Sequence, residues 1–299
     1  MTHLQLEVFL NIYETGSFTK AAQKLSMTQS AVSHSIAGLE KVLGIHLFER
    51  GHKMVKITEA GTLILPHVRE IFNQEAIIRQ KTAALLDCET GAIKVGTFPS
   101  FMANVLPEFL KAFKRQYPGI NVEVFEGGYH EIHEWVHEAD IDFGISIESE
   151  DHAFIPLMRD PMYVVMPIGH ALQQLEVLTV ESLSGEPYIN VKGYETLLEE
   201  IMQNSGVRLN VQYHLHNTYS IISAVEAGLG ITLLPEMALP KTTEKIYCTP
   251  LHPLFTRMIG IIHRSPSTLT PAAKSFVDFL MTRIGFDKGE KAYDASRKA

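Results

Sequence analysis

The chain has 299 residues, of which 45% are hydrophobic and 20% charged, and its formal net charge at pH 7 is −8. This length and composition suit a globular protein of two domains or one large one, and no apolar run reaches the roughly 18 residues that a membrane helix needs. The N-terminal segment lacks the basic start of a secretory signal. Cys88 and Cys248 fit neither a disulfide framework nor a metal spacing, so we expect free thiols in a cytoplasmic protein.

The charge is unevenly distributed along the chain. Residues 1–58 contain six basic and four acidic side chains, a net charge of +2, so the remainder carries −10. A weakly basic head on an acidic body hints at a polyanionic partner for the head.

The head contains three predicted helices. The segment 4–14 has an apolar helical face, Gly16 ends this helix, and Ser17 can cap the next one, "TKAAQKLS". After a tight turn, Thr28 caps a third helix that extends to about Leu43. Two helices joined in this way form a helix-turn-helix unit, whose second helix enters the DNA major groove.

The third helix has two contrasting faces. Its apolar stripe, which predicts the core side, consists of Val32, Ile36, Leu39 and Leu43. Its opposite side carries short or basic groups at Ser30, Ser33, His34, Ala37 and Lys41. Short donors and acceptors can approach base edges closely, but a plain surface helix would explain this face equally well.

The segment that follows favours the DNA-binding alternative. The sequence "LFERGHKMVKITEAG" has a turn at Gly51, with Arg50, Lys53 and Lys56 spread along it. This pattern predicts a small basic hairpin, the wing of a winged helix, which would contact phosphates.

Residues 1–61 resemble the DNA-binding domain of the LysR-type transcriptional regulators. The matching positions are Phe9, Ser17 to Ala22, Leu25, Gln29 to Ser33, Ile36, Leu39, Glu40, Leu43, Gly44, Leu47, Phe48, Arg50, Thr58, Ala60 and Gly61. The chain departs from the family pattern at His34, Ser35 and Lys53. The resemblance implies DNA contacts by Thr19, Gln29, Ser30, Ser33, His34, Arg50 and Lys53.

A long helix is predicted from Thr58 to about Leu86. Apolar residues recur along it in a heptad register at Ile64, Val68, Ile71, Ile78 and Leu85. Such a seam favours a partner helix, although the helix could instead pack on its own domain. In the family this segment is the linker helix that pairs two subunits.

Beyond residue 90, short apolar runs alternate with helical patterns, which predicts an α/β fold with mainly parallel pairing. This part resembles the family's two-lobed effector domain, built like a periplasmic solute-binding protein. The predicted chain crossings lie near Ile147–Pro161 and Ile262–Pro266. The expected domains are 1–58 (winged helix-turn-helix), 59–89 (linker helix) and 90–299 (effector domain), with lobe I at about 90–161 and 267–295 and lobe II at about 162–266.

Three turns of this domain are candidate ligand contacts, because ligands bind beyond the carboxyl ends of strands and beside helix N-termini. Family effector contacts commonly lie at matching turns, which implies effector binding by Ser100, Phe101, Tyr129, Asn217 and Thr218. The alternative for each residue is structural: Ser100, Asn217 and Thr218 as helix caps, Tyr129 as a surface residue and Phe101 as core.

The stretch "HEIHEWVHEAD" contains H-E-x-x-H, the zinc-protease motif, at His133, Glu134 and His137. The buried stripe of this helix is predicted on the side opposite these residues, whereas a catalytic zinc needs a partly dry cavity. Whether His130, His133 and His137 bind a metal at the surface stays open. No other catalytic or cofactor motif is present, so the sequence predicts neither an enzyme nor a cofactor.

Taken with the resemblance, these features predict a non-enzymatic DNA-binding transcription regulator controlled by a small, anionic effector. The implied partners are double-stranded operator DNA, the effector and further copies of the chain as a homodimer or homotetramer, with RNA polymerase as a further candidate and no membrane. A solute-binding protein, which would require export, and a zinc hydrolase are the rival interpretations.

Overall fold

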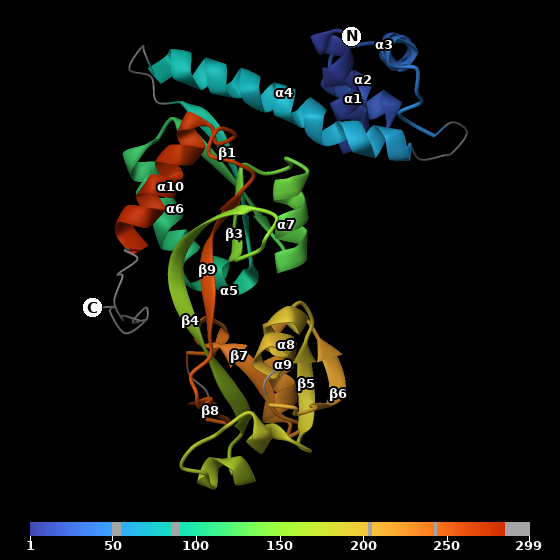
Figure 1. Cartoon of the computed structure of the whole chain (residues 1–299). Helices are drawn as coiled ribbons and strands as arrows, with labels where there is room; N and C mark the ends of the chain where they lie inside the picture. The colour runs from blue at the N-terminus through green and yellow to red at the C-terminus, as the bar shows by residue number, and fades with distance from the viewer. Residues whose placement is uncertain (50–54, 85–89, 203–204, 242–243, 285–299) are drawn as a thin grey trace.

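The computed structural model describes residues 1–49, 55–84, 90–202, 205–241 and 244–284. An N-terminal helical head is joined by one long helix to an elongated two-lobed α/β domain (Figure 1). Within these stretches, none of the helices combines the length and apolar character that a membrane span requires.

The head begins with the three predicted helices, α1 (His3–Thr15), α2 (Phe18–Lys24) and α3 (Gln29–Leu43). The predicted caps are also confirmed. The hydroxyl of Ser17 accepts a hydrogen bond from the backbone N–H of Lys20, and that of Thr28 from Ala31. Gly16 ends α1 with φ +62°, a left-handed conformation that favours glycine.

The core of the head is formed by the predicted stripe of α3. Val32, Ile36 and Leu39 are buried against α1 and Phe48. Phe48 and Ile57 form an antiparallel bridge, which confirms the base of the predicted hairpin. Residues 50–54 lie outside the described residues.

The helix α4 (Glu59–Ala84) runs from the head to the effector domain (Figure 1). Its start is held close to the wing, since a Cβ atom at Gly61 would lie 2.5 Å from the backbone oxygen of Leu47. Leu65 and Val68 are buried in the core of the head. The first half of α4 is therefore part of the head as well as a connector.

Lobe I is built on a mixed sheet, with α6 and α10 on one face and α7 on the other (Figure 1). β1 pairs in parallel with both β2 and β3, and β3 pairs antiparallel with β9. The elements are β1 (Gly91–Thr97), α5 (Pro99–Asn104), α6 (Leu106–Gln116), β2 (Ile120–Glu126), α7 (Tyr129–His137), β3 (Phe143–Ile147), β9 (Thr256–His263) and α10 (Pro271–Ile284).

Lobe II packs two helices and a parallel strand pair against the far half of the long strand β4. β4 pairs antiparallel with both β7 and β8. The elements are β4 (Ala153–Pro167), η1 (Ala171–Gln174), η2 (Glu181–Leu183), β5 (Pro187–Val191), α8 (Glu195–Met202), β6 (Asn210–Leu215), α9 (Thr218–Glu226), β7 (Thr232–Pro235), η3 (Glu236–Ala238) and β8 (Ile246–Pro250).

The two lobes are joined by β4 and β9, which pair antiparallel from Ala153–His263 to Pro161–Thr256. Residues 259–262 of β9 already pair with β3 in lobe I, so the second crossing precedes the predicted 262–266. The reason is that the apolar run 256–263 contains no turn and forms one strand that covers both the crossing and the sheet of lobe I. The antiparallel pairing of β3, β9 and β4 also makes the sheet mixed, where mainly parallel pairing was predicted.

Candidate DNA-binding face and effector cleft

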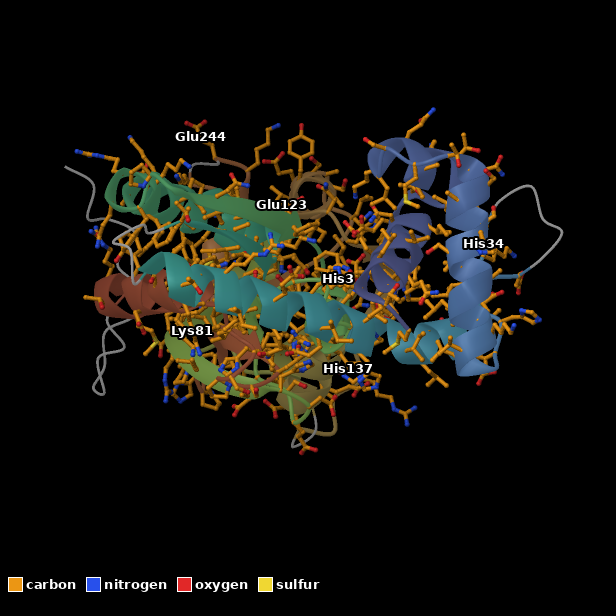
Figure 2. The ribbon with its side chains drawn as sticks, turned by 90° about the horizontal axis from the view of Figure 1, so that it is seen from above. His3, His34, Lys81, Glu123, His137 and Glu244 are labelled. Carbon is orange, nitrogen blue, oxygen red and sulfur yellow. The ribbon has the colours of Figure 1, made fainter. Side chains whose placement is uncertain are left out.

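The face of α3 opposite its buried stripe is polar and open to solvent. Ser30, Ser33 and His34 are exposed, as are Gln29 at the start of α3 and Thr19 on the neighbouring α2. Figure 2 shows His34 on α3, at the end of the molecule away from the effector domain. The structure thus brings the five described DNA-contact candidates onto adjoining turns of α2 and α3.

The wing is fixed to α3 by a residue for which the sequence suggested no role. Glu40 is buried, and its Oε1 accepts a hydrogen bond from the backbone N–H of Leu47 at 2.8 Å. Its other oxygen lies 3.3 Å from Nδ1 of His46. A carboxylate next to the core residue Leu39 was the available signal, because a buried charge requires partners.

The basic residues of the wing are only partly described. Lys56 is exposed at the base of the hairpin. Arg50 and Lys53 lie outside the described residues, so their predicted phosphate contacts stay predictions.

The predicted seam of α4 divides into two parts. Val68 is buried in its own head, so it does not belong to a seam that is free for a partner. Ile71 and Ile78 are 42% and 65% exposed, and Leu63, at 69%, extends their stripe. Leu85 lies outside the described residues. The heptad pattern could not distinguish residues buried in the head from residues exposed for a partner helix. The distinction arises because the head covers α4 on one side only.

In the effector domain, Ser100 and Tyr129 meet at one buried guanidinium. Arg257 of β9 is 2% exposed, and its Nη2 donates to Oγ of Ser100 at 3.2 Å. Its Nη1 donates to the Tyr129 hydroxyl and, at 3.4 Å, to that of Tyr194. Asp160, the direct neighbour of Arg257 on β4, accepts from Nε at 2.9 Å and also from Nη2.

This arrangement gives an acceptor to each of the five N–H bonds of the guanidinium. The Asp160 carboxylate balances the buried positive charge, and the ring of Phe98 lies 4.8 Å from the guanidinium carbon. Burial raises the pKa of Tyr129, so its phenol is neutral and can accept from Arg257. Buried pairs of this kind depend on such complete hydrogen bonding.

The same network links the two lobes. Tyr194, which follows β5 in lobe II, stacks on Tyr129 of lobe I with ring centroids 5.8 Å apart. The side-chain amide of Asn104 donates to the backbone oxygen of Met237 at 2.8 Å, and the Met237 N–H donates to Asp160 at 3.0 Å. Both lobes are therefore tied to the crossing strands at the carboxyl ends of β1 and β2, where α/β folds place ligands.

The sequence did not predict Arg257, Asp160 or Tyr194 as part of this site. The only signal was the presence of charged residues, Asp160 beside Arg159 and Arg257, within two largely apolar runs at 157–166 and 256–263.

The remaining effector candidates lie elsewhere. Phe101 is fully buried beside Phe98 in the core of lobe I, because α5 turns its apolar side onto the sheet, so this ring has no surface for a ligand. Asn217 caps α9 by accepting from the N–H groups of Tyr219 and Ser220. Thr218 is half-buried at the first turn of α9.

An open hollow of about 560 Å³ lies at the start of α9, lined by Leu215, His216, Asn217, Tyr219 and Ser220. Among the described residues, no hydrogen bond joins Asn217 or Thr218 to Ser100 or Tyr129.

The H-E-x-x-H residues do not all lie on an open surface. Ile132 and Val136 are buried as predicted, but His133 is half-buried, and its Nε2 lies 3.1 Å from Oγ of Ser146. Within the part of the chain that the structure describes, no three His, Cys, Asp or Glu side chains form a metal-binding group.

Two protein-family models match most of the chain. The model described as bacterial regulatory helix-turn-helix protein, lysR family, matches residues 3–62, and the LysR substrate binding domain matches residues 87–285. The uncharacterized HTH-type transcriptional regulator YvbU of Bacillus subtilis (strain 168) is 34% identical over 290 residues, which cover 95% of this chain and 99% of that protein. The transcriptional dual regulator GltC of the same organism is 28% identical, over 93% of this chain and 95% of GltC.

Solved structures share the fold. A full-length OxyR variant from Pseudomonas aeruginosa superposes with a TM-score of 0.74 at 20% identity, over 94% of this chain and 97% of that one. Full-length CbnR complexed with its target DNA gives a TM-score of 0.64 at 18% identity, over 94% of this chain and 99% of CbnR.

Proposed function

Because the chain belongs to the LysR family of transcriptional regulators, we propose that it reads operator DNA through α3 and that a small effector bound between its two lobes controls this reading. The family makes it a DNA-binding transcription regulator with a substrate-binding domain for an effector. The observation that carries the DNA-binding proposal is the polar, exposed face of α3 backed by fully buried Val32 and Leu39.

On the DNA side, base edges would be contacted from the first half of α3. The proposed residues are Gln29, Ser30, Ser33 and His34, with Thr19 of α2 beside them. Their side chains are short or planar, and such groups can approach base edges in the major groove. Arg50 and Lys53 would contact phosphates, which position the protein without reading sequence.

On the effector side, the ligand would bind at the ring of residues around Arg257. An acceptor group on the ligand would take the N–H bonds that Arg257 now gives to Ser100 and Tyr129. We propose an anionic ligand, since a carboxylate forms charge-assisted hydrogen bonds with a guanidinium. Asn217 and Thr218 would bind from lobe II.

Binding of this kind would be coupled to DNA through the crossing strands. A ligand shifts a conformational equilibrium only if it makes different contacts in the two states. A ligand that replaced the contacts among Ser100, Tyr129 and Tyr194 would change how the two lobes are held together. This change would provide the difference in contacts between the two states.

We further propose that α4 pairs two subunits through Leu63, Ile71 and Ile78, with a homodimer or homotetramer as the working form. Exposed apolar side chains on a helix, in a stripe about two heptads long, favour a helical partner. The domains would divide near residues 58 and 89. The protein would act in the cytoplasm, where the operator is, and RNA polymerase is a proposed partner.

The experiment has two arms. Fluorescence anisotropy with labelled DNA from the region upstream of the gene should give saturable binding that weakens steeply with salt, whereas a random duplex should bind more weakly. A thermal-shift screen of small carboxylates beside their uncharged amides should give shifts for an acid but not for its amide. Equal affinity for both DNAs would contradict operator reading, and shifts that favour amides would contradict the charge of the effector.

A further inference from the structure

Four histidines from α7, from the residue before β4 and from the end of β9 gather beside the buried face of α7. His133 and His137 lie one turn apart on α7, His152 precedes β4, and His263 ends β9. The ring centroids of His133 and His152 are 5.3 Å apart, and those of His137 and His152 are 6.4 Å apart. His263 pairs with Ala153, the residue after His152. We call these four residues the histidine cluster.

The cluster contains buried nitrogen atoms without hydrogen-bond partners. Within the described residues, both ring nitrogens of His152 and Nδ1 of His263 are buried and unpartnered. Such atoms are rare in folded proteins and call for a functional or solvent-related explanation. A protonated imidazole carries two N–H donors, so charging His152 here would leave both without acceptors unless the structure opened to water.

The surroundings disfavour the protonated forms of three of the four rings. Burial lowers the pKa values of His133, His152 and His263, and the charge that each neighbouring histidine would carry lowers those of His133 and His152 further.

The other charged groups near the cluster act in both directions. Asp151 favours the protonated forms of His133 and His152, whereas His130, itself paired with Glu134 at 3.3 Å, opposes that of His133. From β3, Ser146 offers His133 a neutral partner. Among the described residues, Asp151 is thus the single carboxylate that acts on these two rings, and it does not balance several charges.

The end of α7 is one of the places where the effector domain contacts α4, beside the pair of Arg264 with Glu70 and the hydrogen bond from Asn73 to Thr268. Nη1 of Arg69 on α4 donates to the backbone oxygen of Glu138 at 2.9 Å, and its guanidinium pairs with the carboxylate of Asp140. The same guanidinium carbon lies 5.2 Å from the ring centroid of Tyr13 on α1. α7 lies directly below α4 in Figure 1, and His137 lies close to α4 in Figure 2. We call this contact the Arg69 junction.

We propose that the histidine cluster is a proton sensor whose charging on acidification loosens the Arg69 junction and changes operator binding. Positive rings whose centroids are 5.3 Å apart repel each other and attract water, so α7 would move away from the start of β4. Glu138 follows His137 directly and Asp140 lies three residues after it, so a displacement of the end of α7 moves the groups that hold Arg69. The head would then change its position relative to the effector domain, independently of any effector in the cleft.

The test measures operator affinity of the full-length chain by fluorescence anisotropy between pH 7.5 and 5.5 at constant ionic strength. We expect the affinity of the wild type to change by about fivefold or more, the lower end of typical coupling between sites. In His152→Asn this change should fall to less than about twofold. His130→Asn is the matched control, since His130 is exposed on the same helix and its effect on His133 is the smallest among the groups that act on that ring, so most of the wild-type response should remain.

The chain has 14 histidines, so the difference between His152→Asn and His130→Asn is the decisive quantity. If the first variant does not fold, His137→Asn replaces it, because its exposed side chain tolerates substitution. An unchanged pH response in the cluster variants would overturn the proposal. Stoichiometric zinc binding in calorimetry that His152→Asn abolishes would make the cluster a metal site, which would also overturn it.

Discussion

In the head, the polar side chains of α3 point into solvent, whereas the polar side chains of the effector cleft turn inward onto Arg257. Ser33 and His34 are exposed, while Asp160 and Arg257 are buried and mutually hydrogen-bonded. The difference follows from what each region must do. The proposed DNA-reading face offers free donors and acceptors to a partner, whereas the proposed effector site must satisfy its own polar groups while no ligand is bound.

This contrast predicts that the cleft is sensitive to the loss of a single partner. Arg257→Ala leaves the Asp160 carboxylate buried without its counter-charge, so the effector domain should lose about 3–5 kcal/mol of unfolding free energy. Urea denaturation followed by circular dichroism measures this loss. The double variant Arg257→Met/Asp160→Leu should recover much of the stability, because it removes both charges. A double variant as unstable as Arg257→Ala would show that the pair does more than balance charge.

On the linker helix α4, some apolar residues are likewise exposed to solvent, whereas others are buried in the core of the head. Ile71→Asp places a charge in the proposed subunit interface and should dissociate the oligomer at micromolar concentration, since an unpaired buried charge is strongly unfavourable. Its effect on the unfolding of the head should be small. Val68→Asp should instead unfold the head, because Val68 lies in that core. Light scattering that shows the parental oligomer for Ile71→Asp would mean that the stripe is not the interface.

The helices of the head were predicted better from the sequence than the Arg257 network of the effector domain, because the head depends on local patterns. The helices of the head, their caps at Ser17 and Thr28 and the stripe of α3 depend on residues only a few positions apart, which a sequence displays directly. The contacts of Arg257 join residues 97 and 157 positions apart, to Asp160 and Ser100, and no periodicity encodes them.

Some residues fitted two roles equally in the sequence. An aromatic side chain in a turn, such as Phe101, suits a ligand site or a core, and only the packing of α5 onto the sheet decides between them. Val68 and Ile71 fall in one heptad register, and only the docking of the head on one side of α4 separates them.

On the DNA side, His34→Ala should lower the affinity for the operator by about 1–3 kcal/mol and change the affinity for random duplexes little. The reason is that an exposed imidazole on the first half of α3 can contact base edges, whereas phosphate contacts act on every sequence. Ala37→Ser, on the same face but further along α3, is the matched control. Equal losses on both DNAs would place His34 among the phosphate contacts.

The half-buried carboxylate of Asp142 in lobe I makes the stability of the effector domain depend on pH. Burial raises the pKa of Asp142 from 3.8 to about 6, although its Oδ2 accepts a hydrogen bond from the Lys94 N–H. The folded state therefore binds this proton more tightly than the unfolded state. The stabilising contribution is complete below pH 3.8 and is lost as the pH rises through about 6.

Asp142→Asn should remove this decline and stabilise the domain at pH 7 by about 1–2 kcal/mol, since the amide oxygen keeps the bond to Lys94 without a buried charge. Urea denaturation at pH 4.5 and pH 7 measures both values. A variant that is less stable than the wild type at pH 7 would show that the carboxylate is needed in its charged form.

The smallest effect is expected in the wing, where single charges act through counterion release. Lys53→Ala should weaken binding to every duplex alike and lower the slope of log affinity against log salt by about 1. The reason is that a lysine on a phosphate neutralises one charge without distinguishing one base pair from another. Lys111→Ala, an exposed lysine on α6 in the effector domain, removes the same charge far from the DNA and is the control. Anisotropy titrations at several salt concentrations decide the question, because a Lys53→Ala slope equal to that of Lys111→Ala would remove Lys53 from the DNA interface.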